Sequence, residues 1–109
     1  MITWEDFEKC DIRVGTIIAV DDFPEAKKAS YKLRIDLGEL GIKNSSAQIT
    51  QLYSKTDIIY SQVICVCGFP PKKIGPFTSE VLTTGFYLPT GEVVLSTSER
   101  KVPNGTKLA

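Results

Sequence analysis

The segment from Lys32 to Leu37 alternates charged and aliphatic side chains with a period of two residues. A period of two places alternate side chains on opposite faces of an extended strand, whereas a helix needs a period near 3.6. Leu33, Ile35 and Leu37 are therefore predicted to face a core, and the charged residues between them to face water. This chain is expected to build a β-sheet with one buried face.

Stretches rich in β-branched and aliphatic residues recur along the chain, and glycine or proline turns separate most of them. Their spacing of about 8 to 12 residues favours a small barrel over a parallel fold with crossover helices. Together with the alternating segment, the predicted strands are Asp11–Phe23, Ile42–Ala47, Gln62–Gly68, Glu80–Tyr87 and Glu92–Ser96. The first of these is long enough to curve, and a bend is expected at Gly15.

Two short helices are predicted outside the strands. Thr3, followed three residues later by Asp6, is an N-cap signal for a helix that begins at Trp4 and docks on the rest of the chain. The segment from Gln48 to Tyr53 has apolar residues at helical spacing, which predicts a second helix that caps one end of the barrel.

The chain has 109 residues, which is long enough for one domain and too short for two conventional ones. We therefore predict a single domain over residues 1–109, of the all-β class, built as a five-stranded β-barrel with short helices. A closed barrel also removes the sheet edges that would otherwise aggregate.

Thirteen basic and thirteen acidic residues cancel, so the net charge supplies no general attraction to nucleic acid or to an anionic membrane. The chain has no histidine and only three cysteines, which argues against a zinc site. It contains no phosphate-binding glycine loop, nucleophile elbow or recognisable carboxylate pair. We expect a protein that is not an enzyme, with no catalytic residues, no metal and no other cofactor.

The longest apolar runs, such as Val63–Cys67, are far shorter than the roughly 18 residues that cross a bilayer. Glu5 and Asp6 are acidic where a signal peptide would be basic. We therefore expect a cytoplasmic protein without membrane insertion, whose cysteines are reduced.

Several motifs, in the same order along nearly the whole chain, resemble the signature of the CsaA family. They are Asp11–Ile17, Phe23–Ala26, Gly41–Thr50, Phe69–Ile74, Ser79–Leu82 and the closing Val102–Lys107. The resemblance implies an OB-fold with added terminal segments that form a homodimer. It also implies membership of the wider group of transfer-RNA-binding domains found beside some aminoacyl-tRNA synthetases, and a chaperone role in protein export.

The chain departs from the synthetase-associated relatives at two places. Those relatives typically carry an arginine and a Ser-Gly pair where this sequence has Lys43 and the run Ser45–Ala47. A lysine keeps the charge but lacks the planar fork with which arginine holds a phosphate through two bonds. This difference, together with the neutral net charge, weakens the case for transfer RNA.

A polar cluster lies on the predicted strand Ile42–Ala47 and its exit, on the face that OB-folds commonly present to ligands. With the exposed connection that follows, it supplies the candidate RNA-binding residues Lys43, Asn44, Ser45, Ser46, Gln48, Lys72, Lys73, Ser79 and Glu80. Lysines position phosphates without reading sequence, and hydroxyls and amides bond phosphate, base edge or peptide backbone. The alternative is a polar face that only meets solvent and serves turns.

Apolar residues in and before the same connection are the candidates for binding peptide: Phe69, Pro70, Ile74 and Phe77. Their mixture with lysines and backbone freedom suits the rim of a groove. The alternative is an ordinary loop in which Phe77 packs into the core.

Three functions follow from these candidates. The leading hypothesis is a homodimeric, ATP-independent chaperone-like protein that binds unfolded or pre-secretory polypeptide. The alternative is an OB-fold protein that recognises transfer RNA by shape and phosphate, which would weaken steeply as salt rises. A third is an interaction module whose dimer serves a larger synthetase-like assembly.

Overall fold

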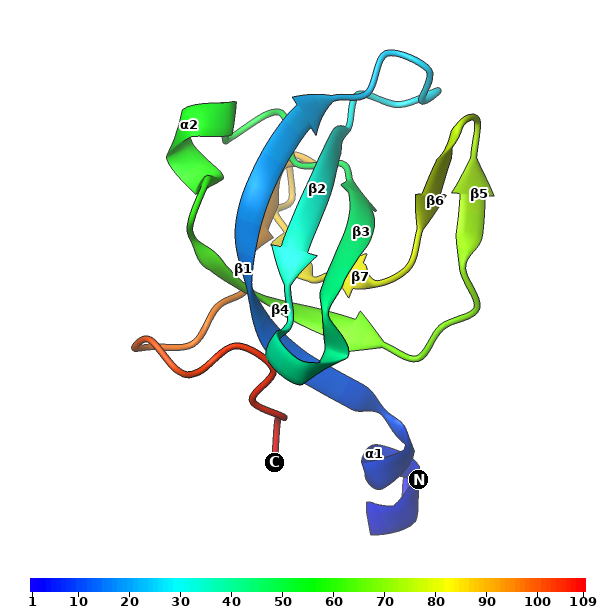
Figure 1. Cartoon of the computed structure of the whole chain (residues 1–109), viewed down its shortest axis with the longest axis vertical. Helices are drawn as coiled ribbons and strands as arrows, with labels where there is room; N and C mark the ends of the chain where they lie inside the picture. The colour runs from blue at the N-terminus through cyan, green and yellow to red at the C-terminus, as the bar shows by residue number, and fades with distance from the viewer.

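The computed structural model describes all residues 1–109 and consists mostly of β-structure (Figure 1). Five strands form an antiparallel sheet in the order β3-β2-β1-β4-β7. These strands are β1 (Asp11–Asp22), β2 (Tyr31–Asp36), β3 (Ile42–Ala47), β4 (Gln62–Cys67) and β7 (Leu82–Thr83). The sheet curls into a nearly closed barrel, so the predicted all-β five-stranded barrel is confirmed.

Two hairpins and three short helical turns complete the chain. One hairpin pairs β5 (Lys72–Ile74) with β6 (Phe77–Ser79), and the other pairs β8 (Gly85–Tyr87) with β9 (Val93–Leu95). The helical turns are α1 (Trp4–Lys9), a 3-10 turn (Gly38–Leu40) and α2 (Lys55–Ile58). The β5–β6 hairpin stands off the barrel on the side of β3 (Figure 1).

The long strand β1 is shared between two neighbours. Its first half, from Asp11 to Thr16, pairs with β4, and its second half, from Thr16 to Asp22, pairs with β2. The register with β2 shifts between Ile17 and Ala19, which is where the strand bulges. A side chain at Gly15 would lie 2.5 Å from the Ile35 side chain, so this glycine permits the close packing of β1 on β2.

The barrel closes where β3 meets the segment that leads into β7. The Asn44 carbonyl accepts hydrogen bonds from the backbone N–H groups of Glu80, at 2.8 Å, and Val81, at 3.3 Å. The hydroxyls of Ser45 and Thr83 lie 2.8 Å apart. These contacts join the two edges of the sheet without a regular ladder.

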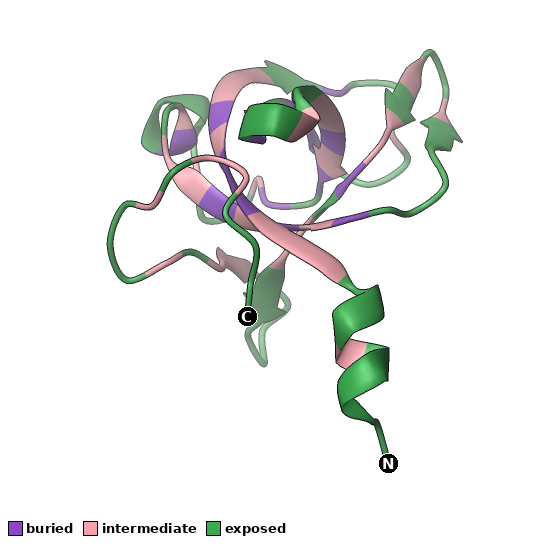
Figure 2. Ribbon diagram, turned by 60° about the horizontal axis from the view of Figure 1, so that its bottom comes forward, coloured by how far each residue is buried: buried purple, intermediate pink, exposed green.

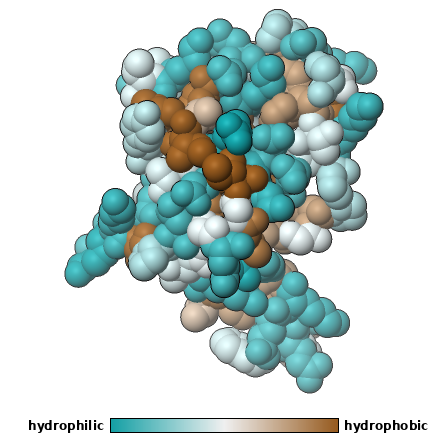
Figure 3. All heavy atoms as spheres, viewed as in Figure 1, coloured by the Kyte–Doolittle hydropathy of each residue, from teal (hydrophilic) through white to brown (hydrophobic).

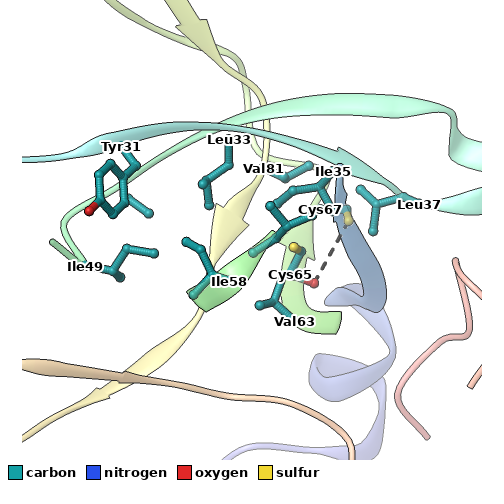
Figure 4. Close-up of a cluster of buried hydrophobic side chains, with 12 residues drawn as sticks. Tyr31, Leu33, Ile35, Leu37, Ile49, Ile58, Val63, Cys65, Cys67 and Val81 are labelled. Carbon is teal, nitrogen blue, oxygen red and sulfur yellow. Dashed lines mark hydrogen bonds between the residues drawn. The ribbon is translucent and has the colours of Figure 1, made fainter. Parts of the chain in front are cut away.

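Twelve buried residues form one core inside the barrel (Figure 4). Leu33, Ile35 and Leu37 are fully buried, as the alternating pattern predicts. Cys65 and Cys67 project from the same face of β4 into this core, since residues two apart in a strand share a face.

The prediction of a helix over Gln48–Tyr53 is wrong. The helix lies one turn later, at α2, where Ser54 and Asp57 form a capping box and the Ser54 N–H donates to the Asp57 carboxylate at 2.7 Å. Ile49 is instead buried in the barrel as the chain leaves β3, so its apolar character reflects the core and not a helix face.

The predicted strand Glu80–Tyr87 is divided into β7 and β8. The division falls at Thr84, whose N–H donates to the Ile64 carbonyl of β4 at 3.0 Å, while its carbonyl accepts from Ser96 beyond β9 at 3.2 Å. The chain therefore changes its hydrogen-bonded partner strand from β4 to β9 at this residue. The predicted connection after Lys72 also differs, because it folds into the β5–β6 hairpin.

The two termini lie at the same end of the barrel (Figure 1). Residues 105 to 108 bond to β1, with the Gly105 N–H donating to the Val14 carbonyl at 2.7 Å. The Gln62 side chain fixes this tail by donating to the Val102 carbonyl at 2.6 Å and accepting from its N–H at 3.1 Å. The helix α1 projects away from the barrel, and none of its residues is buried (Figure 2). No helix is long and apolar enough to cross a membrane.

Replacing Gly105 by alanine is expected to destabilise the fold by about 2 to 4 kcal/mol. The loss has two causes, the strain of a left-handed backbone conformation at a residue with a side chain and a steric clash of the added Cβ. Gly105 has a φ of 87°, and a Cβ there would lie 2.5 Å from the Leu37 carbonyl oxygen. Gly91→Ala is the matched control, because its φ is 98° but no atom lies within 4 Å of the added Cβ. Urea unfolding measures both variants. Equal losses would contradict the close approach of Gly105 to the Leu37 carbonyl.

Only one of the three cysteines is expected to react with a thiol reagent in the native protein. Cys10 is exposed, whereas Cys65 and Cys67 are buried. Burial, reinforced by neighbouring Cys67, raises the pKa of the Cys65 thiol to about 12, so the reactive thiolate is scarce at pH 8. Mass spectrometry after labelling at pH 8 should find one modified cysteine when the protein is folded and three when it is unfolded. Fast labelling of Cys65 in the folded state would contradict this burial.

Candidate functional site

A groove with a volume of about 550 Å³ lies between the β5–β6 hairpin and the barrel. We call it the hairpin groove. It is lined by Ser46, Gln48, Phe69, Pro70, Lys72, Ile74, Ser79, Glu80, Val81 and Leu82. Residues from β3, from the segment before β5, from the hairpin and from β7 thus meet around one space.

Three of the four predicted peptide-binding residues, Phe69, Pro70 and Ile74, line the hairpin groove. The fourth, Phe77, does not. Its ring packs edge-on against Phe23, with centroids 5.4 Å apart, and the Lys32 ammonium lies 5.6 Å from the centre of the Phe23 ring. Phe77 therefore anchors the hairpin to the β1–β2 connection.

Five of the nine predicted RNA-binding residues line the same groove: Ser46, Gln48, Lys72, Ser79 and Glu80. Lys73 belongs to the other face of the hairpin, because Lys72 and Ile74 on either side of it face the groove. Ser45 is fully buried, and its hydroxyl bonds to Thr83. The structure thus brings three of the peptide-binding candidates and five of the RNA-binding candidates together at one place, while Lys43 and Asn44 lie outside the groove lining.

Several of these polar groups bond to one another. The Glu80 carboxylate accepts from the Asn44 N–H at 3.1 Å and lies 3.9 Å from the Lys43 ammonium. The Ser79 hydroxyl accepts from the Ser46 N–H at 3.1 Å. These bonds tie the base of the hairpin to β3, and they place Ser79, Glu80 and Asn44 in the closure of the barrel.

The electrostatics of the groove are nearly balanced. Lys72 and Glu80 are the only charged residues in its lining. The rest of the wall is apolar or neutral, and Phe69 and Leu82 remain 54% and 48% exposed. Such a lining suits an apolar segment better than a run of phosphates, which needs several cations.

A second hollow, of about 360 Å³, adjoins the hairpin groove and shares Ser46, Gln48 and Leu82 with it. We call it the edge hollow. The rest of its lining is Ala47, Ile49, Thr83, Thr84, Gly85, Tyr87 and Val93. Sequence reasoning did not identify these residues. The uncharged run from Leu82 to Leu88 was the available signal, since strands at a barrel surface normally carry polar residues on one face.

A third hollow, of about 390 Å³, lies between α1 and the end of the chain and is lined by Ile2, Thr3, Trp4, Phe7 and Ala109. We call it the terminal hollow. Trp4 is 70% exposed, although its ring packs on that of Phe7 with centroids 5.4 Å apart.

The face of the molecule in Figure 3 is mostly hydrophilic, and a band of hydrophobic residues crosses its upper part. No group of three or more cysteine, aspartate or glutamate side chains gathers to hold a metal ion.

A family model described as "Putative tRNA binding domain" matches residues 12–107. Two solved structures match over the whole chain with a TM-score of 0.93. They are the CsaA chaperone protein of Picrophilus torridus, 50% identical and covered in full, and the chaperone CsaA of Bacillus anthracis strain Ames, 45% identical and covered over 99% of its length.

Methionine–tRNA ligases are also similar to the chain. The ligase of Methanocaldococcus jannaschii is 32% identical over 93% of this chain, and a ligase of Bacillus anthracis is 31% identical over 98%. The chain spans only 15% and 16% of those ligases. A protein of Pyrococcus horikoshii related to methionyl-tRNA synthetase, 21% identical, shares the fold with a TM-score of 0.87 over 98% of its length.

The match to the family model covers most of the chain, and the two CsaA structures match it from end to end. These findings agree with the barrel and with the motifs that line the hairpin groove. They point to a binding domain and not to a catalytic one. The chain therefore belongs to the CsaA family of proteins built on the tRNA-binding domain.

Proposed function

We propose that the protein is a homodimeric, ATP-independent chaperone-like protein that binds unfolded or export-bound polypeptide in the cytoplasm. The observation that carries the proposal is the hairpin groove, whose half-exposed apolar residues Phe69 and Leu82 face a space without a net charge. Unfolded chains expose apolar side chains that folded proteins bury, so such a groove selects them. The two similar structures of chaperone proteins support this choice of ligand.

The binding of any one segment is expected to be weak. Burying the exposed half of one phenylalanine contributes about 1 kcal/mol, and a short segment covers only a few such side chains. Two grooves in a dimer engage two segments of the same unfolded chain, and the second contact then forms at a high effective concentration. Weak single contacts also allow release by simple dissociation, without a nucleotide cycle.

The terminal hollow is our proposed contact between two copies. The helix α1 has six residues, which is too short for stability by itself, and it buries none of them in its own chain. Ile2, Trp4 and Phe7 form one side of the hollow, and Ala109 also lines it. A second copy that covers this apolar surface would supply the packing that α1 lacks.

A second candidate function is binding of transfer RNA, which the matched family model and the similarity to methionine–tRNA ligases favour. Lys43, Lys72 and Lys73 would contact phosphates from β3 and the hairpin. The ion pair between Lys43 and Glu80 counts against tight binding, because the Glu80 carboxylate beside Lys43 repels a phosphate.

The first test compares binding of a permanently unfolded polypeptide, reduced and carboxymethylated α-lactalbumin, with binding of bulk transfer RNA. Polypeptide affinity should change little between low and near-physiological salt, because apolar contacts release no counterions. Phe69→Ser should weaken it about five- to tenfold through lost apolar burial. Leu52→Ser is the matched control, since Leu52 is 44% exposed but outside the groove. Fluorescence anisotropy measures each affinity.

Two results would reject the chaperone proposal. One is transfer-RNA binding that fades steeply with salt, together with no polypeptide binding, which would favour the second candidate. The other is the absence of both activities, which would favour an interaction module of a larger assembly.

The dimer is tested by Trp4→Lys, which should give a monomer because a charge in the terminal hollow cannot be buried without a partner. Glu5→Gln is the control, since it changes the net charge by the same amount on the same helix but does not line the hollow. Analytical ultracentrifugation reads the oligomeric state. A Trp4→Lys variant that stays dimeric would remove α1 from the interface.

A further inference from the structure

The chain from Leu82 to Leu88 is hydrogen-bonded along one edge only. Thr84 bonds to Ile64 and Ser96, and the Leu88 N–H donates to the Glu92 carbonyl at 2.8 Å. In an antiparallel ladder, successive residues point their backbone groups to opposite sides. The backbone groups of Thr83, Gly85 and Tyr87 therefore point away from β4 and β9.

The partner strand confirms this alternation. Leu95 lies opposite Gly85 in the β8–β9 register, and its N–H donates to the Tyr53 hydroxyl at 3.0 Å instead of to β8. None of the hydrogen bonds outside the regular ladders involves the backbone of Thr83, Gly85 or Tyr87. Beside Thr83 that side is occupied by β3, whose Ser45 hydroxyl lies 2.8 Å from the Thr83 hydroxyl, so the open strand edge consists of the donors and acceptors of Gly85 and Tyr87.

The open edge forms one wall of the edge hollow, and the end of β3 forms another. Ser46 lies two residues beyond Asn44, whose backbone bonds to Glu80 and Val81 and so points away from β2. The Ser46 carbonyl is therefore directed outward on the same side. Unpaired main-chain groups thus border the hollow from two strands.

We propose that this open edge binds a segment of unfolded polypeptide as an added β-strand, a proposal that rests on the function proposed above and names how the ligand is held. Donors and acceptors that repeat every two residues, about 6.8 Å apart, match the main chain of an extended polypeptide. No charged side chain lines the edge hollow, so it complements a neutral main chain and offers nothing to phosphate.

The edge lacks two of the features that prevent strand addition in other proteins, although it is short, with two residues in β7 and three in β8. Natural edge strands are protected by lysine, proline or short length. The run from Leu82 to Leu88 contains no charged residue and no proline, and Phe86 and Tyr87 are 66% and 78% exposed. Main-chain recognition is independent of side-chain identity, which suits a protein that binds many different sequences. The ligand class is therefore extended segments, and helical segments are excluded.

The edge hollow and the hairpin groove meet at Ser46, Gln48 and Leu82. A segment added to the open edge would continue across Leu82 toward Phe69. The edge would fix the backbone of the segment, and the groove would receive its apolar side chains. A length of several residues is needed to reach both places, because each extended residue adds about 3.4 Å.

The test uses Tyr87→Pro and Tyr87→Ala. Both remove an exposed side chain, but only proline removes the outward N–H and fills the position that an added strand would occupy. The probe is a labelled ten-residue peptide of alternating valine and threonine, compared with the same peptide methylated on alternate backbone nitrogens. Tyr87→Pro should bind the plain peptide about tenfold more weakly than Tyr87→Ala, and the methylated peptide should not bind. Amide exchange at Gly85 and Tyr87 should slow when plain peptide is bound.

Equal binding by the two variants, and of the two peptides, would overturn strand addition. If binding of α-lactalbumin then still depends on Phe69, the proposed chaperone function stands without strand addition. If the unmodified protein binds neither the peptide nor α-lactalbumin, the proposed function and strand addition are both rejected. Slow exchange of these two amides in the absence of peptide, together with loss of the dimer in Tyr87→Pro, would show that a second copy covers the edge. That result would also overturn the proposal.

Discussion

The barrel depends on β1, because this one strand pairs with two different neighbours along its length. Its first half bonds to β4 and its second half to β2, with a bulge between Ile17 and Ala19 where the register shifts. That bend turns a flat sheet into a curved one, so that the far edges at β3 and β7 come within reach of each other. The C-terminal tail then bonds to the free side of the first half of β1.

The closure of the barrel determines what kind of site the protein can offer. Asn44, Ser79 and Glu80 form hydrogen bonds that join β3 to the base of the hairpin. These bonds engage groups that a phosphate would otherwise contact, while apolar side chains such as Phe69 and Leu82 stay accessible beside the closure. The closure is also incomplete, because the chain changes partner at Thr84 and leaves an edge unpaired. The hairpin groove and the open edge both result from this irregular closure of the barrel between β3 and β7.

The sequence predicts the core better than it predicts the site. Leu33, Ile35 and Leu37 alternate with charged residues, and a period of two has one structural meaning. Ile49 misled the helix prediction because an apolar residue leaving a strand has the same spacing signal as one on a helix face. Phe69 and Phe77 are both aromatic residues near one hairpin, and only the packing of Phe77 on Phe23 distinguishes an anchor from a groove residue. The uncharged run from Leu82 to Leu88 is a local signal of an unusual surface strand, but which of its backbone groups stay unpaired depends on long-range pairing.

The most direct measurement is a map of amide chemical shifts in isotope-labelled protein, titrated separately with an unfolded polypeptide and with transfer RNA at physiological salt. We expect the polypeptide to shift Phe69, Ile74 and Leu82 along the hairpin groove, and transfer RNA to cause small changes or none. Shifts induced by transfer RNA alone, centred on Lys43, Lys72 and Lys73, would contradict a polypeptide-binding groove and identify an RNA-binding surface.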